Sequence, residues 1–465
     1  MELLYKNLLY LTGWPLAVVL LIGGLYFTVR TGCIQLLLKE TIRVVSEKPL
    51  MPGSISSFSA LMVSTASRVG SGNIIGVSVA ICSGGPGAVV WMWICATIGG
   101  ASAFVESTLA QIFKRKKDDG TSYGGPAYYI ESTLKSKILA TIFTLALIFT
   151  YGVGYNMLAS YNLQSAFSTF EFYKTTPNVC WYFGIGIALL FFFCVCGGCK
   201  TIIKTTTFLV PLMGVLYVLF ALAAVIINIE RIPAMFCTIF QSAFDFKAIF
   251  GGFAGSVVML GMKRGLYSNE AGIGSAPNAA ASADVSHPVK QGLVQMLSVF
   301  IDTLVICSAT AFMCLSSGVT PTAENSGAPF VQESISSTFG LIGPIFIAAA
   351  MLLFTFTTLL GNFYYVENCL NYLFGKVPSK SVLIVVRVVG AVLIAYGAAI
   401  KMGLAWDLAD IAQCVLAFIN IPVCVIVGGY VYKALKDYKA QRSEGRNPEF
   451  KAKSIGIQEP TDFWN

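Results

Sequence analysis

Charged residues are scarce in this chain of 465 residues: Asp, Glu, Lys and Arg together make up 12% of it. Soluble domains carry about twice that share. Hydrophobic residues account for 56%, and the mean hydropathy is +0.73. Because so few charges are spread among so many apolar blocks, lipid must surround most of the side chains. The composition therefore excludes a string of soluble domains and indicates an all-α polytopic membrane protein, with residues 1–465 forming a single transmembrane domain.

Catalytic motifs are missing as well. The sequence has a single histidine, His287, which is interpreted as a loop residue, and it has no GxSxG, HExxH or P-loop pattern. Hydrolytic chemistry and ATP-driven pumping are therefore not indicated. Among the 13 cysteines, Cys196 and Cys199 form a CxxC pair with no second pair to complete a metal site, and they are interpreted as buried small side chains. We expect no enzyme, so any energy must come from an ion gradient.

About eleven apolar segments are long enough to cross a bilayer, which takes roughly 20 helical residues. They lie at about 10–29, 56–81, 87–113, 138–167, 179–199, 204–228, 249–266, 289–316, 340–374, 381–400 and 404–432. If the loop after the first segment is cytoplasmic, most of the 31 Lys and Arg residues lie inside, as the positive-inside rule requires. The sequence therefore predicts an N-terminus outside and a C-terminus in the cytoplasm. This placement and lipid headgroups explain the net charge of +8, so no nucleic acid is expected as a partner.

The second segment contains Val69-Gly-Ser-Gly-Asn73 in the middle of an apolar run. Two glycines lower helix propensity, and Ser and Asn can bond to freed backbone groups, so the helix is expected to break here. Unpaired backbone in lipid costs several kcal/mol per group, so a break is tolerated where it lines a cavity or binds something. The half-helix after the break offers N–H groups to a carboxylate, and the half-helix before it offers carbonyl oxygens to sodium. A glycine-packed helix contact is the alternative interpretation.

A second glycine-rich interruption, Gly251-Gly-Phe-Ala-Gly255, lies five segments later. A pair of interrupted segments at matching places in two halves indicates an inverted-repeat transporter. Because each half has five segments, the second half must be inverted. The predicted parts are an extra N-terminal helix at 10–29, a first repeat at 56–228, a second repeat at 249–432 and a basic cytoplasmic tail at 433–465.

Polar side chains inside other segments mark further candidates. Thr357 and Thr358 are adjacent hydroxyls in an apolar helix; such oxygens suit sodium, although bonding to their own helix backbone is the alternative. Glu270 is expected just beyond the seventh segment, where it could pair with Lys263 or Arg264, with capping or fixing of the loop as the alternative. Charges inside a bilayer are costly and usually functional. Those predicted here are Arg68, Glu106, Asp302, Glu367 and Arg387.

Several motifs together resemble one known family. They are VGSGNIIGV (69–77), GGPGAVVWMW (84–93), ESTLAQIFK (106–114), GGPAYYI (124–130), KRGLYSNEAGIGSAP (263–277) and HPVKQGLVQMLSVFIDTL (287–304). They resemble the alanine or glycine:cation symporters, also called sodium:alanine symporters, across residues 55–430. The resemblance implies the bacterial leucine-transporter (LeuT) fold, sodium as the co-transported ion, and a bacterial or archaeal plasma membrane.

The resemblance also implies the residues of the sites. The substrate carboxylate is expected among Gly70, Ser71, Gly72 and Asn73. Sodium is expected on the carbonyl oxygens of Ala66, Val69 and Phe354 and on the hydroxyls of Thr357 and Thr358. The remaining substrate contacts are expected from Gly251, Gly252, Gly255, Ser256, Thr358 and Asn362.

Two departures from the family pattern bear on the substrate. Alanine-transporting members commonly have tryptophan where this chain has Asn362, and glutamine near the position of Ala159. Both changes enlarge or repolarise the pocket, which gives the hypothesis of a larger or more polar neutral amino acid such as glutamine, asparagine or serine. The expected function is sodium-coupled symport of small neutral amino acids, including alanine and glycine, by alternating access. An uncoupled facilitator or channel is the alternative, and the oligomeric state is left open.

Overall fold

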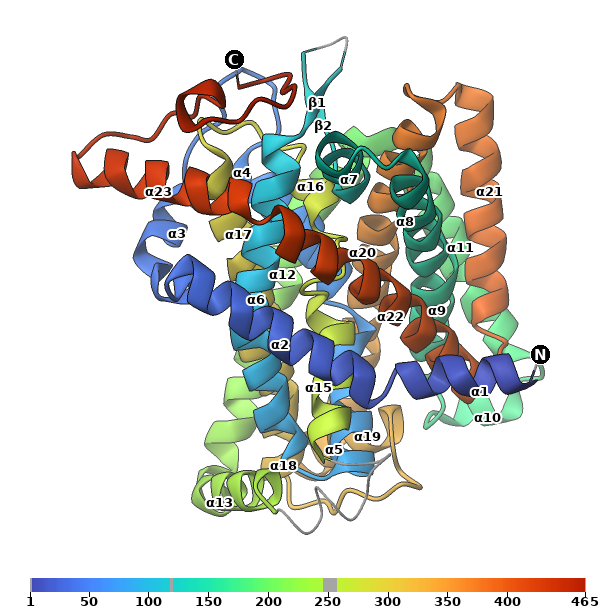
Figure 1. The fold of residues 1–465 in the computed structure, drawn as a ribbon. Helices are drawn as coiled ribbons and strands as arrows, with labels where there is room; N and C mark the ends of the chain where they lie inside the picture. The colour runs from blue at the N-terminus through green and yellow to red at the C-terminus, as the bar shows by residue number, and fades with distance from the viewer. Residues whose placement is uncertain (1, 118–119, 246–256, 465) are drawn as a thin grey trace.

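The computed structural model describes residues 2–117, 120–245 and 257–464 as a bundle of helices (Figure 1). Nine helices in these ranges are long and apolar enough to cross a membrane. The two strands, β1 (Arg115–Lys116) and β2 (Ser122–Tyr123), form a short antiparallel hairpin. The structure confirms an all-α membrane bundle, whereas the count of eleven spanning helices stays a prediction.

The α-helices occupy most of the described residues. They are α1 (Glu2–Leu11), α2 (Trp14–Thr31), α3 (Leu38–Val45), α4 (Ser57–Arg68), α5 (Ile75–Gly84), α6 (Ala88–Ile112), α7 (Pro126–Leu134), α8 (Lys137–Phe149), α9 (Tyr155–Ser165), α10 (Glu171–Thr175), α11 (Val179–Cys196), α12 (Gly198–Ile227), α13 (Ile232–Ala243), α15 (Val257–Asn269), α16 (Pro277–Ala280), α17 (Pro288–Phe300), α18 (Ser308–Ser316), α19 (Ala328–Phe339), α20 (Ile342–Phe374), α21 (Lys380–Gly397), α22 (Met402–Val427) and α23 (Gly429–Ser443). Two π-helical turns, Thr150–Gly154 and Ile301–Cys307, join α8 to α9 and α17 to α18.

The predicted break in the second segment is confirmed. Helix α4 ends at Arg68, and Val69 takes an extended conformation with φ −75° and ψ 91°. A single 3-10 turn, Ser71–Asn73, precedes α5. The two half-helices run toward opposite faces of the bundle (Figure 1). One face carries α3, α7 and α23 and is called the tail face below, and the other carries α13 and α19.

Within the described residues, the helix of the seventh segment is interrupted after α15. Glu270 takes a left-handed conformation with φ 54°, and Gly272 and Gly274 follow with φ 88° and 83°. A short helix, α16, then begins at Pro277. Glycine tolerates positive φ without the steric penalty that a Cβ brings, so this stretch cannot continue the helix. The interruption predicted at Gly251–Ser256 lies outside the described residues.

Helix α15 extends past the predicted end of this segment at residue 266, to Asn269. Lys263 and Arg264 lie inside α15, as they do inside the predicted segment. Lys263 Nζ lies 2.7 Å and Arg264 Nη2 3.2 Å from Asp410 Oδ2 on α22. The expected pairing of these cations with Glu270 is wrong, because α15 continues to Asn269 and the following turn directs Glu270 to Ser67.

Helices α6 and α17 pack closely beside the broken helix. Gly292 on α17 lies against Phe104 and Thr108 of α6, so a Cβ at this position would overlap them. Small residues allow such close helix contacts in lipid, where apolar surface alone does not drive association. The close contact brings the polar residues of α17 against the end of α4.

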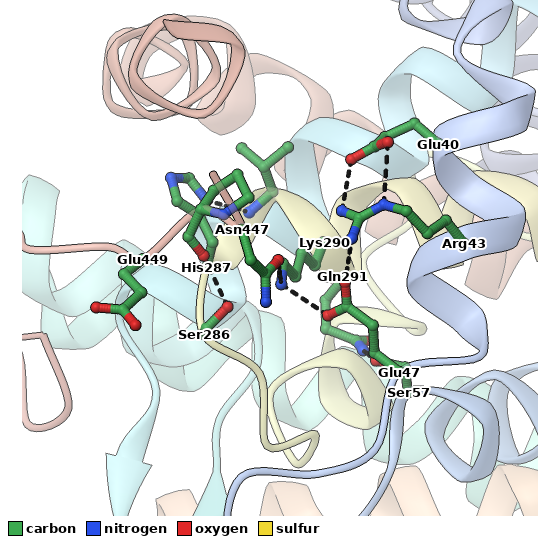
Figure 2. A network of polar contacts seen from close by, with 12 residues as sticks. Glu40, Arg43, Glu47, Ser57, Ser286, His287, Lys290, Gln291, Asn447 and Glu449 are labelled. Carbon is green, nitrogen blue, oxygen red and sulfur yellow. Dashed lines mark hydrogen bonds and ion pairs between the residues drawn. The ribbon is translucent and has the colours of Figure 1, made fainter. Parts of the chain in front are cut away.

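The tail face is held together by an ion-pair network (Figure 2). Arg43 of α3 lies between Glu40 and Glu47, with N–O distances of 2.7 and 2.8 Å. Lys290 of α17 contacts Glu47 Oε2 at 2.6 Å and Asn447 Oδ1 at 2.8 Å. Residues that follow α23 are therefore fastened to the ends of α3 and α17.

The end of the chain docks on α6. Trp464 is buried, and its indole Nε1 donates to the carbonyl oxygen of Gln111 at 2.8 Å. The ammonium of Lys114 lies 4.6 Å from the ring centroid of Phe463 and 4.9 Å from that of Trp464. Burial lowers the pKa of Lys114 to about 7, although the carboxylate of Asp284 opposes the shift. The predicted basic tail is thus a packed part of the fold.

Candidate functional site

Asn73 holds the break in its bent form. Its Oδ1 accepts a hydrogen bond of 2.7 Å from the backbone N–H of Gly70. Its Nδ2 donates to Asp302 Oδ1 at 2.6 Å and to the carbonyl oxygen of Asp302 at 3.2 Å. Both amide hydrogens and one carbonyl lone pair of Asn73 are therefore engaged within the protein. The structure places Asn73 as a positioning residue for the break, and its predicted contact with the substrate carboxylate stays a prediction.

Thr358 joins α20 to the end of α4. Its Oγ1 donates to the carbonyl oxygen of Ala66 at 3.1 Å. A Cβ added to Gly70 would overlap this hydroxyl, so the glycine is required for the close approach. Carbonyl oxygens in the last turn of a helix lack intrahelical partners and can take a cation. Two of the predicted sodium ligands, Ala66 and Thr358, are thus adjacent in the structure.

Thr357 points back to its own helix. Its Oγ1 donates to the carbonyl oxygens of Leu353 at 3.0 Å and Phe354 at 3.1 Å. Thr357 thus makes the bond to its own helix backbone that was the alternative interpretation. Its predicted role as a sodium ligand, together with the carbonyl oxygen of Phe354, stays a prediction. Carbonyl and hydroxyl oxygens of this kind suit a hard monovalent cation. Among the described residues, no cluster of three or more His, Cys, Asp or Glu is placed to hold a metal ion.

Ser71 and Gly72 face two other helices. The Oγ of Ser71 accepts a hydrogen bond of 3.0 Å from Asn162 Nδ2 on α9. Gly72 lies under the ring of Tyr267 on α15, where a Cβ would meet Cε1 at 2.7 Å. The same ring packs edge-on against Tyr155 and Trp406, with centroid distances of 4.9 and 5.0 Å. The break is therefore lined by one polar helix face and by an aromatic cluster.

Asn362 belongs to a buried polar network next to the break. Its Nδ2 donates to Asn156 Oδ1 at 2.9 Å. The hydroxyl of Ser67 lies 2.7 Å from Asn362 Oδ1 and 2.8 Å from Glu270 Oε1. The other carboxylate oxygen of Glu270 accepts from Ser275 at 2.7 Å. The network links α4, α9, α20 and the interruption after α15, so Asn362 lies next to the break, and its predicted contact with the substrate stays a prediction.

Several buried polar atoms around this network have no hydrogen-bond partner in the described part of the chain. They are Asn156 Nδ2, Ser160 Oγ, Asn162 Oδ1 and Trp406 Nε1. Buried polar groups normally find a partner, because leaving one unpaired costs about 1–3 kcal/mol. These unpartnered donors and acceptors of α9 and α22 are therefore available to a small polar molecule.

The sequence prediction missed the contributions of α9 and α15. Asn156 and Ser160 are four residues apart, which places both on one helix face, and this spacing is a signal that could have identified them. Ser268 on α15 donates to Asp302 Oδ2 at 2.7 Å, and no local pattern distinguishes it. Asp302, which the sequence marked only as a buried charge, thus connects both interrupted helices.

A large apolar cavity lies on another side of α4. Its volume is about 360 Å³, and its walls include Met62, Val69, Val210, Pro211 and Ile306. The lining offers almost no polar group to orient a zwitterion, so this cavity does not account for the polar network at the break.

Comparison with known proteins places the chain in a family. Residues 3–452 match the profile of the sodium:alanine symporter family. The "amino-acid carrier protein AlsT" of Bacillus subtilis (strain 168) is 40% identical over 455 residues, covering 97% of this chain and 95% of that protein. The "probable sodium/glutamine symporter GlnT" of the same strain is 41% identical over 439 residues, covering 94% and 90%. The "sodium/proton-dependent alanine carrier protein" of Bacillus sp. (strain PS3) is 36% identical over 446 residues, covering 91% and 96%.

The fold is also similar to a solved structure. The crystal structure of MhsT in complex with L-phenylalanine aligns with a TM-score of 0.54 at 15% identity, covering 84% of this chain and 92% of that one. The alignment confirms the expected LeuT-type fold and, at this identity, nothing beyond the fold. Because the family profile and the relatives both extend along nearly the whole chain, this chain belongs to the sodium:alanine symporter family.

Proposed function

We propose that this chain carries a small neutral amino acid together with sodium across a bacterial plasma membrane. The observation that carries the proposal is the broken helix α4–α5, where Thr358 Oγ1 meets the carbonyl oxygen of Ala66 at 3.1 Å. A break of this kind offers carbonyl oxygens to a cation and N–H groups to a carboxylate at one place. Sodium is assigned to Ala66, Val69, Phe354, Thr357 and Thr358.

The substrate is assigned to the other side of the break. The backbone N–H groups at the start of α5 bind its carboxylate, and Ser71 and Asn362 face its remaining groups. Asn73 acts by keeping Gly70 and Asp302 in place. The predicted contacts from Gly251, Gly252, Gly255 and Ser256 belong to the same proposal.

The names of the relatives point to two substrates, glutamine and alanine. In this chain the amide of Asn362 is surrounded by Ser67 and Asn156, and a side-chain amide of the substrate could take the place of one of these partners. This supports glutamine, asparagine or serine as a substrate in addition to alanine and glycine.

A proton is the second candidate for the coupling ion. Two buried carboxylates touch the break: Glu270 accepts from Ser67, and Asp302 accepts from Asn73. A relative is named a sodium/proton-dependent carrier. An inward proton gradient without sodium would drive accumulation under this alternative.

The tail face is assigned to the cytoplasm, with the N-terminus outside. The support is the positive-inside rule and the basic residues gathered there, such as Arg43, Lys290 and Arg442. A reporter fused to the C-terminus that is active only in the cytoplasm checks this assignment.

The experiment that tests the function is uptake into proteoliposomes. Labelled alanine, glycine, serine and glutamine are offered with an inward sodium gradient, and then with potassium in its place. Accumulation above equilibrium in sodium alone supports symport, whereas equilibration that ignores sodium supports an uncoupled facilitator. Thr358→Ala should raise the sodium concentration for half-maximal uptake about tenfold, the equivalent of one lost oxygen ligand. Thr358→Ser, which keeps the hydroxyl, is the matched control.

A further inference from the structure

Arg68, the last residue of α4, is buried in the interior of the bundle with 2% of its surface exposed. Its Nη1 donates to the carbonyl oxygen of Gln295 at 3.2 Å and to the hydroxyl of Ser298. Its Nε and Nη2 have no hydrogen-bond partner within residues 2–117, 120–245 and 257–464. One edge of a buried guanidinium is therefore unused.

The same edge of the guanidinium, formed by Nε and Nη2, binds carboxylates at two other arginines of this protein. Arg43 donates from Nε and Nη2 to the two oxygens of Glu40, at 3.2 and 2.7 Å. Arg387 uses the same two nitrogens on Glu367 Oε1, at 3.0 and 2.6 Å. Side-on pairing of this kind gives guanidinium groups their preference for carboxylates.

A second unused group lies next to this edge. The side chain of Gln295 is fully buried, and neither its Nε2 nor its Oε1 has a partner among the described residues. Arg68 Nη1 reaches the backbone carbonyl oxygen of the same residue, so the two residues are in contact. Between them, three donor nitrogens have no partner among the described residues: Nε and Nη2 of Arg68 and Nε2 of Gln295.

The buried acids around Arg68 are engaged with other donors. Glu106 accepts from Gly274 and Asn420, and Glu270 accepts from Ser67 and Ser275. Asp302 accepts from Asn73, Ser268 and Thr303. None of the ion pairs found in the described ranges includes Arg68. These three carboxylates offset the charge of Arg68 through space, but its Nε and Nη2 are still without a hydrogen bond in the described ranges. Unsatisfied buried donors are costly, so a ligand that accepts from this edge would be stabilised.

We propose that Arg68 and Gln295 form a second carboxylate subsite for the transported amino acid, on the tail-face side of the break. The site is separate from the N–H groups of α5, because Arg68 ends the preceding half-helix and Gln295 lies on α17, which begins at the tail face. A carboxylate that leaves the break toward the tail face meets this pair next. This proposal rests on the proposed amino-acid transport. It adds a step in which the substrate carboxylate binds Arg68 and Gln295 before release at the tail face.

The test compares transport kinetics measured from the two faces of the full-length protein in liposomes. Arg68→Lys keeps the charge but loses the side-on edge, and Gln295→Leu keeps the volume but loses the amide. We expect each variant to raise the half-saturating alanine concentration at the tail face about tenfold. The half-saturating alanine at the opposite face and the half-saturating sodium should stay within about twofold of the original protein. A purely structural defect would alter all three quantities.

Three further comparisons identify the ligand. Propionate, which has the carboxylate without the ammonium, should compete at the tail face of the original protein but not of Arg68→Lys. Replacing chloride by methanesulfonate, which carries no carboxylate, should change nothing, and a chloride dependence lost in Arg68→Lys would assign the edge to an inorganic anion instead. Gln291→Leu, one helical turn away, is the control for a polar loss on α17.

Unchanged kinetics at both faces in Arg68→Lys and Gln295→Leu would overturn the proposed subsite. Water would then be the hydrogen-bond partner of Nε and Nη2 of Arg68. That result differs from a failure of the proposed function, in which the original protein itself would not accumulate amino acids with sodium. If Arg68→Lys does not fold, Gln295→Leu alone tests the subsite, by a raised or an unchanged half-saturating alanine concentration at the tail face.

Discussion

The side-chain amide of Asn73 donates to Asp302 Oδ1 at 2.6 Å, and this contact ties the broken helix α4–α5 to the π-helical turn after α17. Ser268 of α15 donates to Asp302 Oδ2 at 2.7 Å. One carboxylate therefore connects the two interrupted helices, the kind of element that forms the binding site in transporters of this type.

Loss of this contact should destabilise the whole protein. Asn73→Ala leaves the N–H of Gly70 and the carboxylate of Asp302 without their partner, a loss of about 2 kcal/mol. We expect a lower midpoint temperature in detergent together with weaker substrate binding. Asp302→Asn keeps the shape of the side chain and one acceptor oxygen. Its midpoint temperature should therefore lie between those of the original protein and Asn73→Ala. An Asn73→Ala protein with unchanged stability and reduced binding would instead show that Asn73 touches the substrate.

Gly70 should tolerate no side chain while Thr358 is present. A Cβ there would overlap the Thr358 hydroxyl, so Gly70→Ala should push α4 and α20 apart and abolish sodium-driven uptake. In Gly70→Ala with Thr358→Ala the overlap is relieved. We expect this double variant to recover substrate binding at high sodium, with a raised half-saturating sodium concentration. If Gly70→Ala transports normally, the contact between Gly70 and Thr358 is not part of the ion site.

Asn362 should set the size and polarity of accepted substrates. Asn362→Ala removes the partner of Ser67 and Asn156 and enlarges the space beside the break. We expect the ratio of glutamine to alanine uptake to change by about fivefold or more, since one buried hydrogen bond contributes about 1 kcal/mol. Competition of each amino acid against labelled serine measures this ratio. An unchanged ratio would place the substrate side chain elsewhere.

The tail face should lose stability in acid through His287. Its Nδ1 accepts from the N–H of Val289 and its Nε2 contacts Asp437, each at 3.2 Å, so the neutral ring satisfies both neighbours. Burial lowers the pKa of His287 below its ordinary value, although Asp437 opposes the shift. The unfolded chain then binds the proton more readily, and the stability from this residue is present above about pH 6.5 and declines as the pH falls below it.

The measurement is the midpoint temperature between pH 5 and 8. His287→Asn can still cap α17 through its side-chain oxygen but does not titrate, so its midpoint should fall less in acid than that of the original protein. Parallel curves for the two proteins would exclude His287 as the group that titrates.

The sequence by itself determined the class of the protein and the place of the first break. Low charge and long apolar runs require a helical membrane bundle, since backbone groups in lipid must be satisfied within each helix. Gly70, Gly72 and Asn73 mark a break because these residue types weaken a helix locally, and local effects can be read from a single stretch of sequence.

Only the tertiary structure decided which groups meet there. Thr357 and Thr358 are equivalent in the sequence, yet one hydroxyl bonds to its own helix and the other to Ala66 of α4, because the rotation of α20 depends on packing against distant segments. The pairing of Lys263 and Arg264 with Asp410, and the turn of Glu270 toward Ser67, also depend on contacts far apart in the chain. The unused edge of Arg68 follows from the same cause, since burial and partners are properties of the assembled helices.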